Sequence, residues 1–252
     1  MNTSYIIGGS KGMGFETAKR LVSRGEGVTL VARGEKSLAE AKAELSKFGD
    51  ASVETIAVDL YDEKQIDQLI SNINQETRHI SALVNAAGYF APKPYLEQTR
   101  EDYHVYMDLN EAFFFITQAI AENMKQHGGG SIVNIGSMWA KQAIKATPSS
   151  SYSMAKAGQH AMVQHLAMEL AEYNIRVNGV SPAVVVTSIY KSFIEEDQIE
   201  ETLQGFNEFH PIGRVGRSAD VAATIDFLLI NDSSWVTGAV WDIDGGVMAG
   251  RN

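Results

Sequence analysis

Residues 5–14 read YIIGGSKGMG, and this stretch indicates how the chain folds. A short apolar run with strand composition leads directly into a glycine-rich turn. Phe15, Ala18, Leu21 and Val22 then recur at helical spacing. Glycines let backbone amides approach a pyrophosphate group, and the amino terminus of a helix favours negative charge. Glycines also mark ordinary turns, so it is the position between strand and helix that favours a phosphate site.

The same alternation of short apolar runs and helical segments continues to the end of the chain. The runs are rich in Val and Ile, and most are apolar on both faces, as in parallel strands covered by helices on either side. We therefore predict an α/β fold with a doubly wound, seven-stranded, mainly parallel sheet and helices on both faces. The predicted strands are residues 5–7, 28–31, 53–58, 82–84, 131–135, 176–180 and 239–243.

Composition excludes several classes of protein. Among 252 residues, 21 Lys and Arg stand against 31 Asp and Glu, and the net charge of −10 argues against a nucleic-acid partner. The absence of Cys excludes disulfides, thiolate metal sites and cysteine nucleophiles. The first residues lack a basic signal region, and no stretch approaches the roughly 18 apolar residues of a membrane span. We expect a soluble, cytoplasmic protein with no membrane partner.

No linker rich in Pro, Gly or Ser divides the chain, so residues 1–252 are predicted to form a single domain. The least regular segment is 188–212, where acidic residues crowd an amphipathic stretch. It fits either a pair of surface helices or a mobile lid over a substrate site.

Several motifs in order resemble those of the short-chain dehydrogenase/reductase family. Gly8, Gly12 and Gly14 match its G-x-x-x-G-x-G turn, with Ile7 where Thr is usual. Residues 85–88 read NAAG, similar to the family's N-N-A-G motif with Ala86 in place of the second Asn. Residues 236–238 and 242–246 resemble its closing segment, so the resemblance covers essentially the whole chain and implies a Rossmann-type fold.

The second predicted strand ends in Val31-Ala32-Arg33, without a carboxylate that would accept hydrogen bonds from the ribose of NAD. Arg33 offers a charge-assisted fork to a 2′-phosphate, and Lys11 adds a second positive charge. The predicted cofactor is therefore NADP(H). The resemblance implies that it contacts Gly8, Ser10, Lys11, Gly12, Met13, Gly14, Arg33, Asp59, Leu60, Asn85, Ala86, Gly88, Tyr152, Lys156, Pro182, Val185 and Thr187.

Tyr152 and Lys156 lie four residues apart and share one face of a predicted helix. Tyrosine has a reference pKa of about 10, and a nearby ammonium lowers that pKa by favouring phenolate. Tyr152 then acts as general acid or base on a carbonyl or alcohol oxygen. Taken alone, a Y-x-x-x-K pair is also common on exposed helix surfaces.

The resemblance supplies two further catalytic residues. Residues 134–137 read NIGS, which resembles the family's N-I-S-S segment, with Gly136 replacing its first Ser and Ser137 in the catalytic position. Asn110 matches the position that holds a water beside the lysine. The implied catalytic set is Asn110, Ser137, Tyr152 and Lys156. The interval from Ser137 to Tyr152 is longer than in many members, which indicates a reshaped loop over residues 139–150.

The predicted function is NADP(H)-dependent interconversion of a ketone or aldehyde with its alcohol. Alternatives are a 3-oxoacyl-thioester reductase, a sugar reductase, and a catalytically silent NADP-binding regulator. Candidate substrate contacts are Ser137, Trp139, Gln142, Tyr152 and Tyr190, with Tyr89 and Phe90 also near the pocket.

The remaining expectations concern metals, core packing and assembly. The six His residues lack metal-site spacing, so no metal is predicted. Residues 113–115 (FFF) are expected to pack into the core. The helix from Tyr152 onward is apolar around much of its circumference, which favours burial against another subunit. The resemblance implies a homodimer or homotetramer through helices near 110–127 and 152–173.

Overall fold

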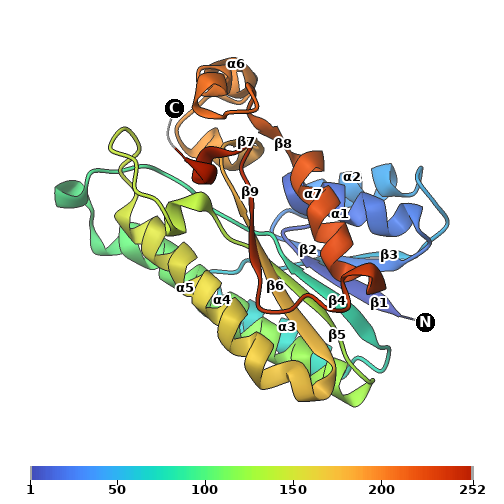
Figure 1. Ribbon diagram of the computed structural model, residues 1–252. Coiled ribbons are helices and arrows are strands. Elements are labelled where there is room, and N and C mark those ends of the chain that lie inside the picture. Colours follow the sequence, from blue (N-terminus) through green and yellow to red (C-terminus); the bar gives the residue numbers. More distant parts are fainter. Residues whose placement is uncertain (1, 251–252) are drawn as a thin grey trace.

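Seven parallel strands form the central sheet of this computed structural model, which describes residues 2–250 (Figure 1). Their order is β3-β2-β1-β4-β5-β6-β9, and each neighbouring pair is parallel. The predicted strands and the doubly wound sheet are confirmed. The strands are β1 (Thr3–Ile7), β2 (Gly27–Ala32), β3 (Val53–Ala57), β4 (Ile80–Asn85), β5 (Gly130–Ile135), β6 (Ile175–Pro182) and β9 (Val240–Ile243).

Helices cover both faces of the sheet, as predicted (Figure 1). One layer consists of α1 (Gly12–Ser23), α2 (Glu35–Leu45) and α7 (Ser218–Leu229), and the other of α3 (Glu63–Asn74), α4 (Arg100–Gln126) and α5 (Ser150–Leu170). Successive strand residues point to opposite faces. In β1, Ile6 therefore packs in the first core layer while Tyr5 and Ile7 pack in the second.

Strand order reverses at β1, whose neighbours are β2 on one side and β4 on the other. In open α/β sheets, ligands bind beyond the carboxyl ends of the strands at such a reversal. The glycine-rich turn after β1 and residues 85–88 after β4 both lie at this point.

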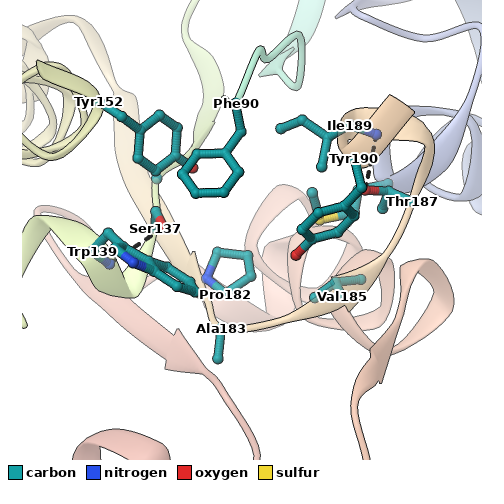
Figure 2. A pocket seen from close by; sticks show the side chains of 12 residues that line it. Phe90, Ser137, Trp139, Tyr152, Pro182, Ala183, Val185, Thr187, Ile189 and Tyr190 are labelled. Carbon is teal, nitrogen blue, oxygen red and sulfur yellow. Dashed lines mark hydrogen bonds between the residues drawn. The ribbon is translucent and has the colours of Figure 1, made fainter. Parts of the chain in front are cut away.

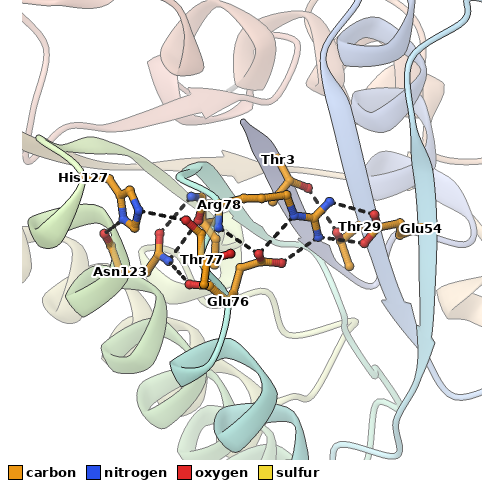
Figure 3. A network of polar contacts seen from close by, with 9 residues as sticks. Thr3, Thr29, Glu54, Glu76, Thr77, Arg78, Asn123 and His127 are labelled. Atoms are coloured by element: carbon orange, nitrogen blue, oxygen red, sulfur yellow. Dashed lines mark hydrogen bonds and ion pairs between the residues drawn. The ribbon is translucent and has the colours of Figure 1, made fainter. Parts of the chain in front are cut away.

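A network of polar contacts lies near the amino ends of the strands, at the end of the sheet opposite the glycine loop (Figure 3). Arg78 donates a bidentate pair of hydrogen bonds to Glu54, at 2.7 and 2.9 Å, and also bonds Glu76. These bonds lower the pKa of both carboxyl groups. Asn123 of α4 accepts from the Ile80 amide at 2.8 Å and donates to two nearby carbonyls. These hydrogen bonds connect β3, the start of β4 and α4 to one another.

Two features differ from the predictions made from sequence. A two-residue strand pair, β7 (Val185–Val186) with β8 (Gly216–Arg217), was not predicted because two residues carry no readable period. The expected burial of all of 113–115 is wrong. Phe113 packs in the core, but Phe114 and Phe115 are 49% and 44% exposed, since consecutive residues turn to different sides of α4.

Segment 188–212 is a series of short turns around α6 (Ile199–Gln204). Its start is held to the loop after β4, because the Ser192 hydroxyl donates to the Phe90 carbonyl. Lys191 and Glu196 form an ion pair within the segment. Between residues 2 and 250, no helix combines the length and apolarity that crossing a membrane requires.

Candidate active site

The glycine loop packs so closely against the chain after β4 that side chains are excluded from it. Gly8 has φ +88°, and a Cβ there would lie 2.4 Å from the Ala87 nitrogen. A Cβ on Gly14 would lie 2.4 Å from the Gly8 carbonyl oxygen. The loop is therefore a bare backbone cradle directly before α1.

The start of α1 and its surroundings fit an anionic dinucleotide. Lys11, the N-cap residue, makes no side-chain cap, and the first turn of α1 holds no acidic residue. The free amides of that turn therefore face outward with the positive end of the helix dipole. The side chains of Lys11 and Arg33 are both exposed, and among residues 2–250 neither forms a hydrogen bond or a salt bridge. Ser10 lies in the glycine loop, and Met13 lies in the first turn of α1.

The predicted adenine and NAAG positions also have structural roles. The Asp59 carboxylate accepts from the Tyr61 amide at 3.2 Å, as in an ordinary turn, and Leu60 is buried in the core. Asn85 is buried and donates to Thr117 at 3.0 Å and to Asn134 at 2.7 Å, which braces β4 against α4 and β5. Ala86 packs against the glycine loop, and Gly88 is exposed.

A narrow pocket brings together residues from both halves of the predicted site (Figure 2). Met13, in the first turn of α1 next to the glycine loop, lines the same pocket as Ser137 and Tyr152. Of the other predicted cofactor contacts, Pro182, Val185 and Thr187 line it too. Its volume is about 50 Å³, enough for only a few water molecules.

Ser137 and Tyr152 are the polar pair of this pocket. Ser137 follows the carboxyl end of β5 and Tyr152 lies in the first turn of α5, and both are buried. Burial raises the pKa of Tyr152 to about 12, and the neighbouring Ser137 hydroxyl opposes this rise only in part. The expected lowering of this pKa by Lys156 is wrong here, because the Lys156 Nζ lies 5.9 Å from the centre of the Tyr152 ring and desolvation dominates.

Lys156 is buried one turn further along α5, which excludes the exposed-pair alternative. Its Nζ donates to the Ile135 carbonyl at 2.8 Å and to Gln159 Oε1 at 3.0 Å. Burial lowers the pKa of Lys156 to about 8. Asn110 joins this group through Gln159, whose Nε2 donates to Asn110 Oδ1 at 2.7 Å. The four predicted catalytic residues therefore gather in one place, with the Gln159 amide lying between Asn110 and Lys156.

The structure places Gln159 and His160 beside the predicted catalytic residues, and the sequence did not predict either of them there. The Ser137 amide donates to His160 Nε2 at 3.4 Å. A Cβ at position 136 would lie 2.0 Å from this nitrogen. The imidazole therefore occupies the space that the first serine of the family's N-I-S-S segment would fill. Burial, with Lys141 and Lys156 nearby, lowers the pKa of His160 to about 4. The imidazole is neutral at pH 7 and accepts at Nε2.

Aromatic side chains form the walls of the pocket, as Figure 2 shows. The Phe90 ring meets the Tyr152 ring edge-on at 4.8 Å and also lies near Trp139 and Tyr190. The Trp139 Nε1 is buried and finds no hydrogen-bond partner among the described residues. The prediction for Gln142 is wrong for this pocket: in the part of the chain that the structure describes, Gln142 is not among the lining residues. Tyr89 packs on Tyr106.

Comparisons with known proteins agree with this geometry. A family model described as enoyl-(acyl carrier protein) reductase matches residues 8–248. The 3α-hydroxysteroid dehydrogenase of Mediterraneibacter gnavus is 31% identical over 245 residues, covering 96% of this chain and 95% of that protein. The levodione reductase of Leifsonia aquatica is 29% identical over 97% of this chain and 93% of its own length.

Solved structures give the same result. The crystal structure of L-sorbose reductase from Gluconobacter frateurii, complexed with NADPH and L-sorbose, aligns with a TM-score of 0.90 and 25% identity, covering 98% of this chain and 97% of that one. A levodione reductase structure aligns with a TM-score of 0.90 and 28% identity over 98% of both chains. From the fold, the site and these relatives, the chain belongs to the short-chain dehydrogenase/reductase family, whose members bind NAD(P), and is an oxidoreductase acting on alcohol and carbonyl groups.

Proposed function

We propose that this protein is an NADP(H)-dependent carbonyl reductase that also runs in the alcohol-oxidising direction. The observation that carries the proposal is that Ser137, Tyr152 and Met13 line one pocket. The buried proton donor, Tyr152, therefore lies close to the place where the glycine loop would hold the cofactor. A nicotinamide cofactor, when bound, supplies the hydride that these side chains lack.

The choice of NADP(H) over NAD(H) rests on Arg33 and Lys11. Both are exposed cations whose side chains form no hydrogen bond or salt bridge among residues 2–250, and both lie beside the loop that would hold the pyrophosphate. A guanidinium fork matches a 2′-phosphate, whereas a carboxylate at the end of β2 would be needed to bind the ribose of NAD. A relative whose structure contains NADPH is consistent with this preference.

In the proposed reaction, the Ser137 hydroxyl binds the substrate oxygen and Tyr152 donates a proton to it. Because burial raises the pKa of Tyr152 to about 12, the phenol holds its proton at pH 7 and is suited to act as the acid in carbonyl reduction. Lys156 provides positive charge below the phenol. The oxidising direction requires phenolate and becomes more favourable as pH rises.

The aromatic walls favour an apolar, ring-containing ketone over a sugar or an extended acyl thioester. Phe90, Trp139 and Tyr190 provide flat apolar surface, and the unpartnered Trp139 N–H suits one further oxygen acceptor on the substrate. Relatives named for hydroxysteroids and levodione act on cyclic molecules of this kind.

Substrate entry requires movement of the segment 188–212, which we propose is a lid. A pocket of about 50 Å³ is far below the roughly 300 Å³ of a typical ligand site. Ile189 and Tyr190 of this segment close it. Limited proteolysis within 188–212 should slow when NADPH and substrate are both present, and unchanged cleavage would argue against a lid.

Assembly through α4 and α5 is the remaining part of the proposal. Phe114, Phe115, Met154 and Met168 are between 44% and 83% exposed on these helices. Apolar area of this kind is typical of a subunit interface. We propose a homodimer or homotetramer, and light scattering that shows a monomer at assay concentration would refute it.

The decisive experiment measures NADPH consumption with cyclic ketones and diones, sugars and 3-oxoacyl thioesters. We expect turnover with the cyclic compounds. Tight NADPH binding with no turnover on any of them would instead support a silent cofactor-binding regulator.

A further inference from the structure

Gln159 has a buried side chain next to the lysine of the active site. It lies three residues after Lys156 on α5 and is 6% exposed, as is Lys156 itself. Its Oε1 accepts from Lys156 Nζ at 3.0 Å, and its Nε2 donates to Asn110 Oδ1 at 2.7 Å. Two elements that meet only in the folded protein, α4 and α5, are joined through this one amide.

The direction of each hydrogen bond in this chain is set by the lysine. An ammonium only donates, so Gln159 must present its oxygen to Lys156 and its NH₂ group to Asn110. Asn110 must then accept with its oxygen and donate with its nitrogen, which it does to the Ala155 carbonyl at 2.8 Å. Flipping either amide would set two donors or two acceptors against each other.

The acceptors around Lys156 also favour its charged form. Two of its three N–H groups are used by Gln159 Oε1 and the Ile135 carbonyl, which leaves one N–H for the reacting side of the site. Hydrogen bonds to the charged form of a group stabilise that form. An amide, unlike a hydroxyl or water, does not pass a proton along without becoming an imidic acid.

We propose that Gln159 is a positioning residue that keeps Lys156 charged and oriented by linking it to Asn110, so that the Lys156–Gln159–Asn110 chain ends at the Ala155 carbonyl. The role of this arrangement in catalysis rests on the proposed function. Its effect on the charge of Lys156 does not.

The other charged and titratable groups near Lys156 do not compete with Gln159 in stabilising the charge of the lysine. Tyr152 and His160 share α5 with it, and His160 is neutral because burial lowers its pKa to about 4. Lys141 is paired with Asp242 of β9 at 2.8 Å. No carboxylate forms an ion pair with Lys156 within residues 2–250. Burial lowers the pKa of Lys156 to about 8, and removing an acceptor lowers it further.

The test compares Gln159→Met, which removes the acceptor at similar length, with Gln159→Glu, which places a carboxylate there. Gln164→Met is the matched control, since Gln164 is exposed on the same helix. The first readout is the titration of Lys156 by NMR of protein labelled with ¹³C at lysine Cε, assigned with Lys156→Met. The second readout is the alkaline limb of the kcat–pH profile with NADPH.

We expect the Lys156 midpoint to fall by about one pH unit in Gln159→Met, to rise in Gln159→Glu and to stay unchanged in the control. Activity that needs the ammonium is lost as pH rises through this pKa, so the alkaline limb should move in the same two directions. A purely structural role would not produce opposite shifts. Unchanged midpoints in both folded variants, or shifts of the same sign, would overturn the proposal. Opposite NMR shifts without wild-type turnover would support the role in lysine charge and refute the proposed function instead.

Discussion

The contact between position 136 and His160 predicts a large effect from a single methyl group. In Gly136→Ala, the new Cβ would lie 2.0 Å from His160 Nε2 and 2.6 Å from its Cδ2. An ordinary contact needs about 3.4 Å, so the imidazole must retreat by about 1.4 Å. That retreat breaks the hydrogen bond from the Ser137 amide to Nε2, which is 3.4 Å long.

The expected cost follows from overpacking. Forcing one methyl group into a packed site destabilises by about 1–3 kcal/mol, which for a chain of this size lowers the melting temperature by about 2–12 °C. Ser137 moves with its backbone, and misplacing a catalytic group by about 1 Å reduces kcat about 100-fold. Both effects should appear together because one contact causes them.

The assay is a double-mutant cycle of Gly136→Ala and His160→Ala, read by thermal melting and by NADPH-dependent turnover. With the imidazole removed, the nearest remaining contact of the added methyl is the Val180 carbonyl oxygen, at 3.2 Å. We therefore expect a favourable coupling of about 1–2 kcal/mol. Gly158→Ala is the control for thermal melting. Gly158 lies on α5 with His160, its Cβ would lie 3.6 Å from Asn110 Nδ2, and better helix propensity should raise the melting temperature. If Gly136→Ala costs the same with and without His160, the contact does not explain the glycine.

Three further predictions concern chemistry, cofactor choice and pH. Tyr152→Phe keeps the ring contact with Phe90 and removes the hydroxyl, so kcat should fall by about 10³-fold while the NADPH Kd, measured by fluorescence, changes less than about threefold; turnover within tenfold of the parent would contradict the role of Tyr152. Arg33→Ser should weaken NADPH binding about 10- to 100-fold and leave NADH binding nearly unchanged, and calorimetry that shows equal losses would exclude a 2′-phosphate contact. Burial lowers the pKa of His160 from the usual 6.5 to about 4 in the folded chain. As pH falls, the unfolded chain therefore takes up the proton first, and the free energy of unfolding drops between about pH 6.5 and 4 by at most about 3.4 kcal/mol. Urea unfolding should show a shallower decline in His160→Gln, and an equal decline would contradict this assignment.

The strands and the phosphate loop were predictable because their physics is local. Parallel strands buried on both faces are mostly apolar, and a loop position where an added Cβ would lie 2.4 Å from another backbone must be glycine. The spacing of Tyr152 and Lys156 likewise places them on one helix face. These features need no knowledge of what packs around them.

The features that were missed depend on partners distant in sequence. Gln159 meets Asn110 across 49 residues, and His160 meets Ser137 across 23. The direction of the pKa shift of Tyr152 depends on burial by Phe90 and Tyr106, which no spacing along the chain indicates. The faces of Phe114 and Phe115 were wrong because a run of three aromatics cannot all point inward from one helix.

The strand order also determines when this protein can begin to assemble on the ribosome. β1 needs β4 as its inner neighbour, and Ile7 pairs with Asn85, which emerges 78 residues later. At about 5–20 residues per second, the first strand waits roughly 4–16 s for this partner. Its outer neighbour β2 emerges earlier, so β1 and β2 stand meanwhile as a parallel pair with an uncovered apolar edge. Until residue 85 has been made, the inner edge of β1 therefore has no partner strand and stays open to pairing with another chain.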